Sequence, residues 1–106
     1  MSDIVRLPKK DLEIIKTCFL KHFDLNDHLW IFGSRVIASK KGGDIDLYIE
    51  TNEPDPIKAN HKKMLFVNDL WLTLGDQKID VVLNLLQHPI QLPIYEIAKK
   101  TGIQIQ

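Results

Sequence analysis

Three aspartates, Asp44, Asp46 and Asp80, are the residues of this chain best suited to carry chemistry. Asp44 and Asp46 begin the alternating segment DIDLYIE, which predicts a β-strand over residues 44–50. Residues two apart on a strand project from the same face, roughly 6.6 Å apart. Carboxylates so close repel each other unless positive charge lies between them, and Mg²⁺ commonly takes one or two carboxylates together with substrate phosphates. The pair therefore favours a metal site over the alternative, a solvent-facing hairpin.

A turn suited to phosphate binding precedes this strand. Gly33 and Ser34 follow the apolar segment 28–32, which predicts a buried strand. Glycine lets the backbone approach a phosphate closely, and the Ser34 hydroxyl and backbone N–H groups can donate to phosphate oxygens. Positive charge nearby comes from Arg35, Lys40 and Lys41. The segment thus predicts phosphate donors on one side and metal-binding carboxylates on the other.

Asp80 supplies a third carboxylate. It enters an otherwise apolar strand predicted over 78–86, on the face that also carries Val82 and Asn84. If this strand pairs beside strand 44–50, Asp80 can join the first two aspartates. There it would bind a metal or accept the proton of a nucleophile, and the sequence leaves both roles open.

The elements that must position these residues alternate between helix and strand. They are a helix over 8–22, strands over 28–32, 44–50 and 78–86, a short helix or turn between the first two strands, a helix over 57–74 ending at Gly75, a short helix over 94–100 and an edge strand over 103–106. Helical spacing places Met64, Val67, Trp71 and Leu74 on the core face of the long helix. Trp30 and Trp71 are both expected to be buried, and so is Cys18.

The predicted fold is a single α+β domain, residues 1–106, with α/β-like alternation of elements. Its small sheet has three core strands flanked by helices. The link between the first two strands is shorter than the dozen or so residues of a usual parallel crossover. Those two strands are therefore expected to be antiparallel, which makes the sheet mixed.

The composition indicates which partners and which cell compartment to expect. The formal net charge is zero, which argues against direct nucleic-acid binding. One cysteine allows no internal disulfide, in keeping with a reducing compartment. No apolar run approaches the ~20 residues of a membrane span, and the charged start is unlike a signal peptide. We expect a cytoplasmic protein that does not enter a membrane.

In these motifs the chain resembles the minimal nucleotidyltransferase domains of the DNA polymerase β-like superfamily. Their pattern is an apolar strand, a Gly-Ser pair, roughly ten residues, Asp-x-Asp on the next strand and a later aspartate. Here it reads Gly33-Ser34, nine residues, Asp44-Ile45-Asp46 and then Asp80. The resemblance covers nearly the whole chain, including the ending IYEIAKKTGIQIQ.

The resemblance implies the polymerase β-like fold and an Mg²⁺-dependent transferase that uses ATP, with two metal ions expected. It implies metal binding and catalysis by Asp44, Asp46 and Asp80, and nucleotide binding by Gly33, Ser34, Arg35 and Lys41. Similar small proteins form toxin–antitoxin modules with a helical HEPN ribonuclease, and some transfer AMP to a tyrosine of that toxin. A HEPN-type partner is thus implied, and either a homo-oligomer or a hetero-oligomer is open.

The sequence departs from the nucleotidyltransferase motif at two positions, so functions without catalysis stay open as alternatives. Ala38 stands where many relatives have glycine, and Ile37 where a polar residue is common. The three aspartates are all in place, so an active enzyme is favoured over an antitoxin that acts by binding alone or a nucleotide-binding module without turnover. Tyr48 shares the aspartate face, and either packs with a wetted hydroxyl or touches the nucleotide base.

Overall fold

The computed structural model describes residues 9–33, 45–75, 78–88 and 90–106. In chain order, the elements are α1 (Lys9–His22), β1 (His28–Phe32), β2 (Ile45–Thr51), α2 (Pro56–Leu74), β3 (Ile79–Leu85), α3 (Pro93–Thr101) and β4 (Ile103–Gln104). Every element expected within these ranges is present, with bounds within about two residues of those predicted. A short helix or turn was also expected between the first two strands, but it falls in residues 34–44, outside the described residues.

The strands form one mixed four-stranded sheet in the order β3-β2-β1-β4. The antiparallel pairing of β1 with β2 confirms the prediction drawn from their short link, while β2 and β3 run parallel. The expected edge strand near the C-terminus pairs antiparallel with β1, with Trp30 opposite Gln104. The three core strands thus become a four-stranded sheet.

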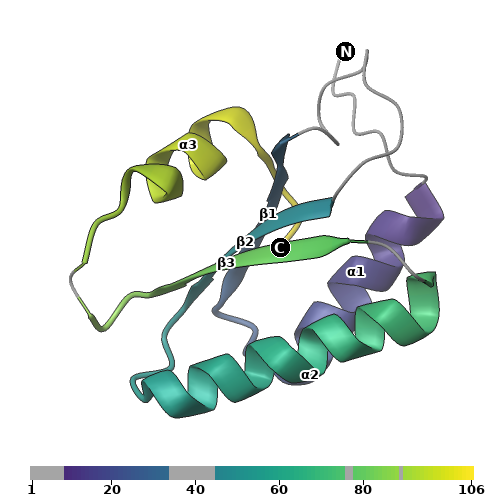
Figure 1. The fold of residues 1–106 in the computed structure, drawn as a ribbon, viewed down its shortest axis with the longest axis horizontal. Helices are drawn as coiled ribbons and strands as arrows, with labels where there is room; N and C mark the ends of the chain where they lie inside the picture. Colours follow the sequence, from purple (N-terminus) through teal and green to yellow (C-terminus); the bar gives the residue numbers. More distant parts are fainter. Residues whose placement is uncertain (1–8, 34–44, 76–77, 89) are drawn as a thin grey trace.

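Helices cover both faces of the sheet, with α1 and α2 together on one face and α3 on the other (Figure 1). The larger core lies under α1 and α2, where alternate strand residues such as Ile31, Leu47 and Ile49 meet Phe19 and Phe66. This alternation follows from the period of two along a strand. Because the odd-numbered residues of β2 fill this core, Asp46, Tyr48 and Glu50 share the other face, as predicted, and the structure shows that this face is the one toward α3.

Local sequence signals set the ends of α2. Asp55 caps the helix by accepting a hydrogen bond at 2.9 Å from the backbone N–H of Ile57, and Pro56 follows at the first helical position. At the other end the helix stops at Gly75, whose φ is +90°. Residues with side chains rarely adopt such a backbone conformation, so this glycine fixes where the helix ends.

The prediction for the core face of α2 was wrong for Met64 and Trp71, whereas Leu74 packs partly buried against the core. Ala59, Phe66 and Leu70 are the buried residues of this helix, whereas Met64 and Trp71 are exposed. The helix carries large apolar side chains on more than one side, so its sequence period does not decide which side turns inward. Trp30 and Cys18 are buried as expected.

The C-terminal segment returns to the sheet through a close contact at Gly102. A Cβ atom there would lie 2.7 Å from the carbonyl oxygen of Ile31 and 3.0 Å from Cβ of Phe32. Only glycine therefore lets the end of α3 lie against β1 at this distance. The contact places β4 in register with β1.

Among the described residues, no helix combines the length and the apolar character needed to cross a membrane.

Candidate active site

Asp46 and Asp80 lie side by side at the start of two parallel strands. Asp46 on β2 is the register partner of Asp80 on β3. Neighbouring strands are about 4.8 Å apart, and paired residues of parallel strands project from the same face. Asp80 is exposed and Asp46 partly so, which keeps both carboxylates within reach of solvent. The condition set by the sequence, that Asp80 can join the earlier aspartates if its strand pairs beside theirs, is met for Asp46.

Gly33 closes the other side of Asp46. Its φ of +78° is a conformation that favours glycine. A Cβ atom on Gly33 would collide with carboxylate oxygen Oδ2 of Asp46 and lie 3.1 Å from its Cγ. The absence of a side chain at residue 33 therefore makes room for this carboxylate.

These three residues meet at one end of the sheet because of strand direction. β1 ends at Phe32, the register partner of Asp46, and the antiparallel β2 begins there. The parallel β3 begins beside it. The sheet thus brings Gly33 of the predicted phosphate-binding turn together with the two aspartates, although Asp80 lies 47 positions after Gly33 in the sequence.

The other predicted site residues cannot be placed. Ser34, Arg35, Lys41 and Asp44 lie outside the described residues, and so does Lys40. Their assignment to phosphate and metal binding stays a prediction.

The donor set fits a hard divalent cation. Two adjacent carboxylates supply the oxygen ligands that Mg²⁺ prefers, and their exposure leaves room for water and substrate phosphates to complete its coordination. Asp46 and Asp80 would be the ligands from the described part of the chain.

Farther along the same face, Tyr48 takes part in a polar network. Its hydroxyl donates to Oε2 of Glu50 at 2.8 Å and accepts from Nδ2 of Asn84 at 2.9 Å. Nζ of Lys99 on α3 lies 3.1 Å from the same oxygen of Glu50. Burial, and then the neighbouring carboxylate of Glu50, raise the pKa of Tyr48 well above its ordinary value, although the hydrogen bond from Asn84 opposes the shift.

The network makes Tyr48 a packing residue. Its ring is fully buried, with its centroid 5.2 Å from that of Trp30 and 5.6 Å from that of Tyr95 on α3. The packed alternative for Tyr48 is therefore the observed one. Its hydroxyl, expected to be wetted, is instead bonded to protein groups on both sides.

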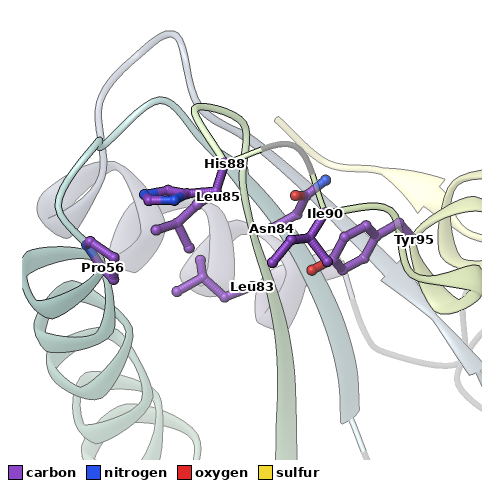
Figure 2. Close-up of a pocket in the computed structure, with 7 residues that line it drawn as sticks. All are labelled: Pro56, Leu83, Asn84, Leu85, His88, Ile90 and Tyr95. Atoms are coloured by element: carbon purple, nitrogen blue, oxygen red, sulfur yellow. The ribbon is translucent and has the colours of Figure 1, made fainter.

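A hollow lies at the far end of β3. It is lined by Pro56, Leu83, Asn84, Leu85, His88, Ile90 and Tyr95 (Figure 2). Its volume is about 210 Å³, below the roughly 300 Å³ at which ligand pockets usually begin. Asn84 in its wall lies four residues beyond Asp80 on the same strand, about 13 Å away. The hollow is thus separate from the aspartates.

Sequence reasoning missed two residues that shape the aspartate face. Phe32 lies opposite Asp46, and its place beside that carboxylate depends on the register of β1 with β2. Lys99 reaches the face from α3 and lies 5.5 Å from the ring centroid of Trp30. Lys99 falls in the predicted helix over residues 94–100, but the side of the sheet covered by that helix could not be inferred from the sequence.

Comparison with protein-family models and with curated proteins gave no match for this chain.

Proposed function

We propose that this protein is an Mg²⁺-dependent nucleotidyltransferase that transfers AMP from ATP to a hydroxyl group. The observation that supports the proposal most is the register pairing of Asp46 with Asp80, beside a glycine that leaves space for the first carboxylate. The polymerase β-like fold belongs to the same proposal. The mixed sheet with its antiparallel first pair and parallel second pair is compatible with that fold.

In the proposed reaction the acceptor oxygen bonds to the α-phosphorus of ATP. The bond from that phosphorus to the bridging oxygen breaks, and pyrophosphate leaves. Bound Mg²⁺ would supply positive charge that stabilises the phosphate oxygens in the transition state. Gly33 leaves space for the carboxylate of Asp46, and this carboxylate would be a ligand of the metal ion. The more exposed Asp80 either shares the metal or takes the proton that the acceptor hydroxyl releases.

The acceptor we propose is a tyrosine of a helical HEPN-type toxin, with the transfer silencing that toxin. This part rests on the resemblance of the motif to small antitoxins of such modules. We also propose that the protein is located in the cytoplasm, as expected for such a module.

The test is intact-mass analysis of the proposed partner, a helical HEPN-type protein encoded by a neighbouring gene, after incubation with this chain, ATP and Mg²⁺. We expect the mass of one AMP group to be added by the wild-type chain and no addition by Asp46→Asn or Asp80→Asn. Glu13→Gln is the matched control, because it neutralises an exposed carboxylate on α1, on the opposite side of the sheet. It should transfer AMP normally.

Two results would overturn the proposal. Full transfer by Asp46→Asn or by Asp80→Asn would remove that aspartate from the active site. No transfer by a folded wild-type chain that forms a stable complex with the partner would instead establish an antitoxin that acts by binding alone.

A further inference from the structure

One side of α2 presents large apolar side chains to solvent. Ile57 is 80% exposed and Leu72 85% exposed, near the two ends of the helix. Exposed apolar residues also lie between them at helical spacing, and the whole set, here called the α2 stripe, is Ile57, Met64, Leu65, Trp71 and Leu72. Positions 57, 64 and 71 are seven apart, about two helical turns, so they share one side. The buried face of the helix, with Phe66 at its centre, is turned the other way.

The N-terminal half of the stripe is shaped to receive a side chain. A shallow hollow of about 430 Å³ is lined there by Pro56, Ile57, Asn60, His61 and Met64. Positions 57, 60, 61 and 64 have the i, i+3, i+4, i+7 spacing of a hole that accepts one knob from a facing helix. The opposite end of the stripe carries the protruding Leu72 beside Trp71. One helix thus offers both a hole and a knob.

Charge along α2 divides in the same way. Its first half carries Lys58, Lys62 and Lys63 and no acidic residue after the cap, whereas its second half carries no lysine or arginine. The one acidic residue of that second half, Asp69, is paired with Lys21 and His22 of α1 in the same chain. Two parallel copies of α2 would place lysines against lysines. Two antiparallel copies would keep the lysines of the two first halves apart, and would also oppose the helix dipoles.

We propose that two copies of this chain associate through their α2 stripes as an antiparallel helix pair with two-fold symmetry. In this arrangement Leu72 and Trp71 of each copy lie against the hollow of the other, and Met64 and Leu65 lie near the symmetry axis. A two-fold contact is self-complementary, so one rotation fills both hollows. The 19 residues of α2 span about 28 Å, which is long enough for both contacts to form together. The inference does not depend on the proposed catalytic function.

The first experiment measures the mass of the full chain in solution by sedimentation equilibrium over a range of concentrations. We expect the wild-type chain to dimerise and Leu65→Glu to weaken the dimer by roughly thirty-fold or more, as for a central interface residue. Leu25→Glu is the matched control, because Leu25 is 76% exposed but lies in the turn between α1 and β1. It should leave the dimer unchanged. Circular dichroism establishes that each variant is folded.

A second experiment fixes the direction of the helices. In a Cys18→Ala background, chains carrying His61→Cys are mixed with chains carrying Leu72→Cys and oxidised. Antiparallel pairing predicts mixed disulfide dimers in excess of either self-linked dimer. Self-linked dimers in excess would overturn the antiparallel arrangement.

A monomeric wild-type chain, or a dimer that Leu65→Glu leaves intact, would overturn the proposal as a whole. If the wild-type chain is monomeric and Leu65→Glu abolishes binding to a helical partner protein, the stripe belongs to that partner and not to a second copy. Retained AMP transfer by a monomeric Leu65→Glu variant would support the dimer contact as separate from the active site, provided the wild-type chain dimerises.

Discussion

The carboxylate of Asp46 lies in the space that a side chain on Gly33 would occupy. Gly33 also adopts a φ of +78°, so its lack of a side chain serves both the backbone conformation and the neighbouring carboxylate. The end of β1 and the start of β2 are thereby fitted to each other at the point where the proposed active site begins. A substitution at residue 33 should therefore affect stability and function through separate causes.

We expect Gly33→Ala to lower the free energy of unfolding by about 1–3 kcal/mol, since a side chain at positive φ is strained, and to abolish AMP transfer because Asp46 must move. Urea unfolding and the intact-mass assay measure the two effects. Gly75→Ala is the matched control: its φ is +90°, but nothing lies within 4 Å of an added Cβ. It should show a similar loss of stability with normal transfer per folded molecule. Equal transfer by both variants would contradict the role given to Gly33.

The arrangement of the strands followed closely from the sequence. Strict alternation in residues 44–50 predicted which side chains of β2 face the core, and the short link after Gly33 predicted an antiparallel first pair. These features depend on period and chain length, which are local properties. The pairing of Asp80 with Asp46 could only be stated as a condition, because register between distant strands is set by tertiary packing.

The orientation of α2 was not predictable by the same means. Phe66 and Leu70 point inward while Met64 and Trp71 point outward, yet both sets have helical spacing. A period identifies an apolar side only when the other sides are polar. The prediction failed because α2 has a second apolar side, the α2 stripe.

Mg²⁺ should stabilise the protein through the paired aspartates. A ligand that binds only the folded state at one hundred times its Kd adds about 2.7 kcal/mol to the free energy of unfolding. We expect a gain of this size for the wild-type chain, measured by urea unfolding with and without Mg²⁺, and less than about a third of it for Asp46→Asn or Asp80→Asn, which lose a ligand. Glu13→Gln should keep the full gain. An undiminished gain in both aspartate variants would place the ion elsewhere.

Asp27 should contribute to stability without contributing to catalysis. This fully buried carboxylate accepts hydrogen bonds from the Thr51 hydroxyl at 3.0 Å and from the backbone N–H groups of Asn52 at 2.9 Å and Asp24 at 3.1 Å. It joins the turn before β1 to the end of β2. Asp27→Ala would leave the buried Thr51 hydroxyl without this acceptor, at about 1–3 kcal/mol, and would also remove the bonds to the two part-buried backbone N–H groups.

We therefore expect Asp27→Ala to lower the free energy of unfolding by about 2 kcal/mol or more, as measured in urea. Asp24→Ala, at an exposed neighbouring position, should change it little, because the backbone N–H of residue 24 remains. Asp27 contacts the end of β2 opposite Asp46, so transfer per folded molecule should be normal in both variants. A transfer defect in folded Asp27→Ala would connect this cluster to the active site.

Tyr48 should make stability fall at high pH. Burial favours the neutral phenol and raises its pKa in the folded chain, whereas the unfolded chain has an ordinary tyrosine pKa of about 10. The unfolded state therefore releases its proton first as pH rises. The contribution of this group is fully present below about pH 10 and is lost progressively above it, through the higher pKa of the folded state.

The corresponding variant is Tyr48→Phe, which removes the bonds to Glu50 and Asn84 and should cost about 1–3 kcal/mol at neutral pH. We expect the stability difference between wild type and Tyr48→Phe, measured by urea unfolding, to be constant below about pH 10 and to shrink above it. Tyr95→Phe is the control, because it removes a phenol from the same aromatic cluster and leaves those hydrogen bonds in place. A difference that stays constant at high pH for Tyr48→Phe would contradict a raised pKa. Normal AMP transfer by folded Tyr48→Phe is also expected, since the partners of the Tyr48 hydroxyl, Glu50 and Asn84, lie four residues beyond the two aspartates on their strands.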